Sequence, residues 1–123
     1  MFEYPFMHRA NAGFSCIGID LRGLGMSDKP WWDYSYRVFA DDVQKVMNVL
    51  KLEWHFGLVG FSMGGAVAMR YVAKYYPNTI SHLILTGAAA PSLTKRKGHQ
   101  YGHDKTFCDG IIAKLLQNRP KTV

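Results

Sequence analysis

The sequence contains the stretch Gly60-Phe61-Ser62-Met63-Gly64, which matches the pattern G-x-S-x-G. A short apolar run precedes it at residues 55–59, and apolar residues recur at helical spacing after it, from Met63 to Tyr76. A serine in this pattern, on a turn that leads directly from a strand into a helix, is typical of a nucleophile elbow. We therefore expect Ser62 to lie on a tight turn, with its hydroxyl exposed at the carboxyl end of a sheet.

The residues around the serine each have an expected role. Gly60 and Gly64, two positions before and two after it, are expected to keep neighbouring side chains from colliding in so tight a turn. Gly65 then lets the helix pack close to the strand. Ser62 is the candidate nucleophile, and the backbone N–H of Met63 is the candidate donor to an oxyanion. The alternative is a glycine-rich turn whose serine only caps the helix.

Strand and helix patterns alternate along the rest of the chain. Apolar runs predict strands at residues 14–20 and 80–86, and helical spacing predicts a helix over residues 35–52. This alternation predicts the α/β class, with a mainly parallel sheet flanked by helices. Because the strands lack polar alternation, we expect helices to cover both faces of the sheet. Residues 88–105 are expected to form a loop, followed by an amphipathic segment at 107–116.

Length and charge indicate one core with a basic extension. The chain has 123 residues, enough for one domain, and 48% of them are hydrophobic, which favours a packed core. The formal net charge is +6, and residues 91–123 hold seven Lys/Arg against two Asp/Glu. We therefore divide the chain into a core at 1–90 and a basic extension at 91–123. The run Lys95-Arg96-Lys97 is too short to indicate a nucleic-acid partner, and a solvated loop is the simpler interpretation.

No metal, cofactor or membrane segment is expected from the sequence. Cys16 and Cys108 lie far apart and form no C-x-x-C pair, which favours neither a disulfide framework nor a zinc site. His99 and His103 have the spacing of metal ligands on a helix, but the glycines beside them argue against a helix there. No run approaches 18 consecutive apolar residues, and the N-terminus lacks the pattern of a secretory signal. We expect a soluble protein of the reducing cytoplasm.

A second motif lies upstream of the serine. Residues 20–28 have the sequence Asp-Leu-Arg-Gly-Leu-Gly-Met-Ser-Asp, which is similar to a D-x-R-G-x-G-x-S loop. With both motifs in this order, the chain resembles the α/β-hydrolase superfamily, and Ala-Ala-Ala-Pro at 88–91 is similar to its non-haem chloroperoxidase or perhydrolase-like branch. The resemblance implies a partial α/β-hydrolase fold over residues 2–118. It also implies a serine hydrolase that acts on an ester or related small-molecule acyl substrate.

The resemblance further implies a catalytic acid and a histidine after the serine, and neither is found where the family places it. His82 lies inside a predicted strand, whereas His99 and His103 lie in the basic extension. Asp104 and Asp109, the acids that follow the serine, also fall in the extension. We therefore expect this chain to be the central part of a longer protein. The acid, the histidine and the other oxyanion donor are expected to lie outside it.

A second hypothesis is that the chain acts alone, as a non-catalytic remnant or interaction module that keeps only the turn. In the family, a further strand separates the strands expected at 14–20 and 55–59. Its absence leaves two strand edges without a neighbour. Direct pairing of the two strands, self-association or a partner chain would each cover these edges, as would the remainder of a longer protein.

Two smaller features concern the loop at residues 22–32. Arg22 and Asp28 are expected to pair and brace it. Trp31 and Trp32 either line an acyl pocket or pack as ordinary loop aromatics. The apolar neighbours of the serine suit an uncharged acyl substrate.

Overall fold

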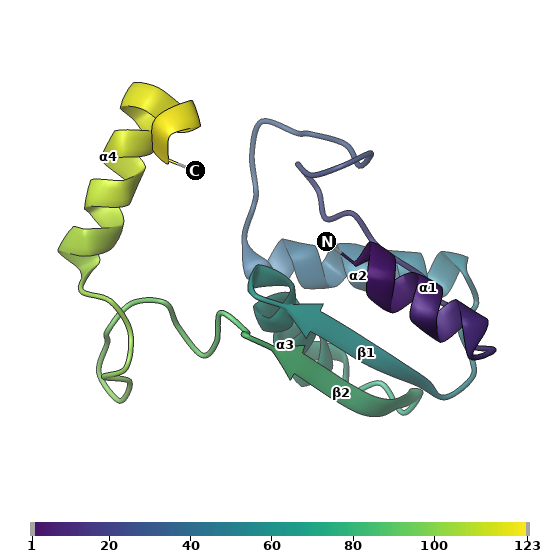
Figure 1. Cartoon of the computed structure of the whole chain (residues 1–123). Coiled ribbons are helices and arrows are strands. Elements are labelled where there is room, and N and C mark those ends of the chain that lie inside the picture. Colours follow the sequence, from purple (N-terminus) through teal and green to yellow (C-terminus); the bar gives the residue numbers. More distant parts are fainter. Residues whose placement is uncertain (1, 123) are drawn as a thin grey trace.

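The computed structural model describes residues 2–122 (Figure 1). Within this range the elements follow one another as α1 (Glu3–Asn11), α2 (Tyr36–Val49), β1 (Phe56–Phe61), α3 (Met63–Tyr75), β2 (Ile80–Thr86) and α4 (Lys105–Thr122). Helix and strand alternate from α2 to β2, which confirms the predicted α/β class.

The two strands form a parallel pair, connected by α3. Gly57 lies opposite His82 near one end of the pair, and Phe61 lies opposite Thr86 at the other. Helix α3 packs on the sheet, mainly on β1, and α2 packs on α3 (Figure 1). The carboxyl ends of both strands therefore lie at the same edge, where α3 begins.

A small apolar core joins α2 to α3. Its buried members are Phe39, Ala40, Val43, Val67 and Tyr71. Helix α2 begins at a serine cap, because Ser35 Oγ accepts a hydrogen bond from the backbone N–H of Val38 at 3.4 Å. The cap and the apolar stripe together confirm the helix predicted at 35–52, which the structure ends at Val49.

Polar contacts also hold α2 against α3. The Asp41 carboxylate of α2 accepts hydrogen bonds from the Lys74 ammonium and, at 2.5 Å, from the Tyr75 hydroxyl. These contacts, led by the one from Lys74, lower the pKa of Asp41. The same hydrogen bond to Asp41 raises the pKa of Lys74. Burial raises the pKa of Tyr71 in the adjacent core.

The strand expected at residues 14–20 is absent. The segment is irregular, and the side chains of Phe14 and Ile17 are 60% and 51% exposed. A strand needs a neighbour to take up its backbone N–H and C=O groups. In the described part of the chain β1 pairs with β2 alone, so direct pairing between β1 and this segment is also wrong.

Coverage of the sheet by the described residues is incomplete. Apolar side chains along the strands are between 38% and 51% exposed: Val59, Phe61, Leu83, Ile84 and Leu85. Helix α3 covers one face, and no second described helix packs across the other. The apolar composition of the strands therefore exceeds what this chain buries by itself.

The loop predicted at residues 88–105 is confirmed, because no described residue between β2 and α4 lies in a helix or strand; within it, residues 94–103 fold back on themselves in a small turn, called the basic hairpin below. The backbones of Arg96 and His99 exchange hydrogen bonds of 2.8 and 2.9 Å, and Thr94 lies in a bridge with His103. Helix α4 then runs beyond the helix expected at 107–116 and, among the described elements, packs against no other helix or strand (Figure 1). Within residues 2–122, no helix combines the length and apolar character needed to cross a membrane.

Candidate active site

Ser62 occupies the turn between β1 and α3, in the strand–turn–helix context that the sequence predicts. Its backbone has φ 50° and ψ −119°, a conformation that residues other than glycine rarely adopt. Three backbone hydrogen bonds hold it there. The Ser62 N–H donates to Thr86 O at 3.1 Å, and the Ser62 carbonyl accepts from Gly65 N at 3.0 Å and from Ala89 N at 2.8 Å.

The tight approach of three segments explains the small residues around this turn. A Cβ atom on Gly60 would lie 2.6 Å from both the carbonyl oxygen of Gly64 and the Cα of Gly65. A Cβ on Gly65 would lie 2.5 Å from the Cβ of Ala88. At Gly64 a Cβ would meet no atom within 4 Å, so the structure gives no steric support to the role expected for this glycine. The steric demand falls instead on Gly60 and Gly65.

The Ser62 side chain does not cap α3, since no hydrogen bond joins it to the first turn of the helix. The residue is half-buried, and its hydroxyl has no hydrogen-bond partner among the described residues. Met63 is the first residue of α3, so its N–H lacks an acceptor within the helix and lies at the positive end of the helix dipole. The interpretation of Ser62 as a helix cap is thus wrong.

The structure brings no described histidine into hydrogen-bond contact with Ser62. His82 pairs with Gly57, which places it roughly 15 Å along the strand from the turn, and its Nδ1 lies 3.1 Å from Ser81 Oγ. His99 Nε2 lies 3.1 Å from the backbone oxygen of Ser92. The ring of His103 stacks on Phe107 at 4.5 Å.

The later carboxylates have other partners. Asp104 lies 3.2 Å from Lys95, and Asp109 lies 4.0 Å from Lys105 on the next turn of α4. Within the described residues, the carboxylate of neither forms a hydrogen bond or ion pair with Ser62 or with one of the three histidines that follow it. The described chain therefore positions a serine on a strained turn without an adjacent base.

The loop that follows the irregular segment is held by its own polar groups. Asp20 Oδ2 accepts from the backbone N–H of Met26 at 2.9 Å, and Ser27 Oγ donates to Asp20 O at 2.6 Å. Gly25 packs over that carboxylate with φ 50°, and a Cβ there would lie 2.0 Å from Asp20 Oδ2. The aspartate, glycine and serine of the upstream motif thus form one closed loop.

The pairing of Arg22 with Asp28 is wrong. Arg22 forms a two-pronged ion pair with Asp42 of α2, with Nε–Oδ2 at 2.6 Å and Nη2–Oδ1 at 2.9 Å. The guanidinium lowers the pKa of Asp42, and the carboxylate raises the pKa of Arg22. The arginine therefore ties the loop to α2, and its Nη1 also donates to the backbone oxygen of Asp33 at 3.2 Å.

Trp31 and Trp32 do not pack as ordinary loop aromatics, because their side chains are 93% and 73% exposed. The interpretation that they line an acyl pocket stays a prediction. Ala88 and Ala89 also hold the serine turn, a role that the G-x-S-x-G pattern does not predict. The run of small residues after β2 was the available signal.

Comparisons with known proteins match residues 3–122 to the alpha/beta hydrolase fold family. The chain is 48% identical over 123 residues to an AB hydrolase superfamily protein from Bacillus subtilis (strain 168), covering 100% of this chain and 46% of that protein. It is 34% identical over 109 residues to a non-haem chloroperoxidase from Kitasatospora aureofaciens, covering 89% of this chain and 39% of that one.

A solved structure is also similar. An esterase from Exiguobacterium antarcticum superposes with a TM-score of 0.93 at 41% identity, over 98% of this chain and 45% of that chain. The chain thus spans less than half the length of these relatives. The resemblance to the non-haem chloroperoxidase branch is confirmed.

Proposed function

The chain belongs to the α/β-hydrolase family, and we propose on that premise that Ser62 is the nucleophile of a serine hydrolase acting on an ester or a related acyl substrate. The observation that supports this most is the backbone of Ser62, with φ 50° at the junction of β1 and α3. Strained conformations of this kind persist only where the surroundings enforce them, and they cluster at active sites. The esterase similar to this chain supports the same class of reaction.

The proposed reaction follows from the turn. Ser62 Oγ attacks the acyl carbon while its proton passes to a general base, and the carbonyl oxygen gains negative charge. The N–H of Met63, at the start of α3, donates to that oxygen, where the helix dipole also favours negative charge. The alcohol then leaves with a proton, and water hydrolyses the acyl-serine to restore Ser62.

We assign the general base and its orienting acid to parts of the protein outside this chain. The described histidines and the later aspartates make other contacts, and the relatives are more than twice as long. A serine nucleophile without its base retains only residual rate enhancement. The 123-residue chain alone is therefore expected to show no appreciable esterase turnover.

Peracid formation is a narrower proposal, supported by the similarity to a bifunctional esterase/perhydrolase from Acinetobacter calcoaceticus, which is 31% identical over 107 residues, covering 87% of this chain and 38% of that protein. In that reaction hydrogen peroxide replaces water as the second nucleophile. Its oxygen bonds to the acyl carbon, the acyl–Ser62 bond breaks, and a peroxycarboxylic acid leaves while the serine regains its proton.

The competing proposal is a non-catalytic module, favoured by the lack of a base beside Ser62 in the described chain. In that case the exposed face and edges of the β1–β2 sheet serve contact with a second copy or a partner chain.

A fluorophosphonate probe separates the two proposals. The 123-residue chain and a longer protein that contains it are incubated with the probe, and labelled peptides are identified by mass. We expect rapid labelling of Ser62 in the longer protein, loss of labelling in Ser62→Ala, and retention in the matched variant Ser27→Ala. Absence of labelling and of ester hydrolysis in a folded longer protein would contradict the hydrolase proposal.

A further inference from the structure

A groove of about 610 Å³ lies between the outward side of α3 and the segment that leads from β2 into the basic hairpin. Its floor is mostly apolar and includes Met69 and Ala73 of α3, with Leu93 across from them. Two arginines, Arg70 and Arg96, also line it. The volume falls within the range of about 300–1,000 Å³ that is typical of small-molecule sites.

The charge of the groove has one sign. No acidic residue lines it, and among the described residues Arg70 forms no ion pair. One N–H of the Arg96 guanidinium donates a hydrogen bond to the carbonyl of Pro91, at 3.1 Å, and the other guanidinium N–H groups have no partner among the described residues. Arginine stays protonated at any ordinary pH, so the groove carries two positive charges.

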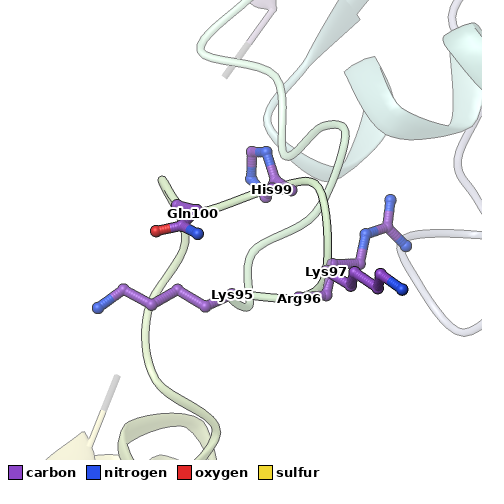
Figure 2. Close-up of a pocket in the computed structure, with 5 residues that line it drawn as sticks. All are labelled: Lys95, Arg96, Lys97, His99 and Gln100. Carbon is purple, nitrogen blue, oxygen red and sulfur yellow. The ribbon is translucent and has the colours of Figure 1, made fainter.

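A second, smaller hollow of about 360 Å³ shares Arg96 and continues the basic surface. Its other lining residues are Lys95, Lys97, His99 and Gln100. Figure 2 shows Arg96 and Lys97 extending from one side of the turn and Lys95 from the other. The basic side chains of the hairpin therefore add positive charge beside the groove.

We propose that this groove binds a linear aliphatic carboxylate, with the carboxylate between Arg70 and Arg96 and the hydrocarbon chain along Met69, Ala73 and Leu93. A guanidinium fork matches the two oxygens of a carboxylate and holds it by charge-assisted hydrogen bonds. The apolar floor removes a hydrocarbon chain from water, which neither an inorganic anion nor a nucleic acid would exploit. The proposal is independent of the role of Ser62.

Calorimetric titration of the folded chain with octanoate tests the site. Octanol and octyltrimethylammonium, which keep the chain and change the head group, serve as matched probes. We expect octanoate to bind at least about tenfold more tightly than either, because the charged hydrogen bonds are lost. The affinity should fall with rising salt, since the arginines are exposed.

Variants assign the binding to the groove. Arg70→Gln and Arg96→Gln should each weaken octanoate binding about tenfold. Ala73→Trp should fill the floor and abolish it, while Arg9→Gln on α1, which removes the same charge elsewhere, should leave it unchanged. Circular dichroism confirms that each variant is folded.

Four results would overturn the proposal. Octanol could bind as tightly as octanoate, or the arginine variants could bind octanoate like the unchanged chain. A dimer that dissociates in Ala73→Trp would mean that a second copy occupies the groove. Loss of octanoate binding in a longer protein would mean that other parts of that protein cover it.

Discussion

The substitutions Gly60→Ala and Gly64→Ala should change the free energy of unfolding in opposite directions. A Cβ on Gly60 lies 2.6 Å from backbone atoms of Gly64 and Gly65, so the backbone must shift by roughly 0.8 Å to reach ordinary contact. We expect Gly60→Ala to lower the free energy of unfolding by about 1–3 kcal/mol. This net figure includes a smaller stabilising effect, because alanine restricts the unfolded chain more than glycine does. Gly64 has open space and lies within α3, so Gly64→Ala should raise it by about 0.5–1 kcal/mol.

Thermal and urea unfolding followed by circular dichroism measure both changes. For a chain of this size, 1 kcal/mol corresponds to about 4 °C in Tm. Gly60→Ala should therefore lower Tm by about 4–12 °C and Gly64→Ala should raise it by about 2–4 °C. Equal stabilities for Gly60→Ala and the unchanged chain would refute the close approach of β1 to α3. A lower Tm for Gly64→Ala than for the unchanged chain would show that the tightly packed region extends further into α3.

Substitutions at three other positions probe the strain, the ion pair and the core. Ser62→Gly should raise the free energy of unfolding by about 0.5–1 kcal/mol because it relieves the strained backbone, and Ser62→Ala should stay within about 0.5 kcal/mol, both measured by urea unfolding. Asp42→Asn should lower it by about 1–2 kcal/mol at pH 7, since Arg22 loses its counter-charge. The folded pKa of Asp42 lies below its ordinary 3.8, so the unfolded chain takes up the proton first as the pH falls. The pair therefore stabilises fully above about pH 5, and the difference between variant and unchanged chain should shrink as the pH falls below 3.8; a constant difference would contradict the pairing. Tyr71 is 2% exposed, so Tyr71→Ala should lower the free energy of unfolding by about 3–5 kcal/mol, whereas Tyr71→Phe should lower it by less than about 1 kcal/mol. Similar losses for both variants would mean that the hydroxyl, and not the packing of the ring, stabilises the core.

The elements around the serine were predictable because their causes are local. Ser35 caps α2, apolar residues repeat at helical spacing in α2 and α3, and the glycines mark the turn. The strands at 56–61 and 80–86 were predicted from apolar runs within a residue or two of their ends. Each of these patterns is complete within about fifteen residues of sequence.

Features that depend on distant partners were not predictable in this way. The run at 14–20 has the composition of a strand, but no backbone in the described chain pairs with it. Arg22 has Asp28 nearby in sequence, yet packing of the loop on α2 brings it to Asp42, twenty residues away. The contact of Gly65 with Ala88 likewise arises only once β2 lies beside β1.

Three chain segments pack closely against one another at the serine turn. Gly60 from β1, Gly65 from α3 and Ala88 after β2 touch through atoms that leave no room for one further methyl group. A methyl added to α3 here is accommodated only if one is removed across the interface, as in Gly65→Ala combined with Ala88→Gly. Divergence at these positions is thus constrained to compensated steps, and an engineer who redesigns the corner has to treat all three as a single unit.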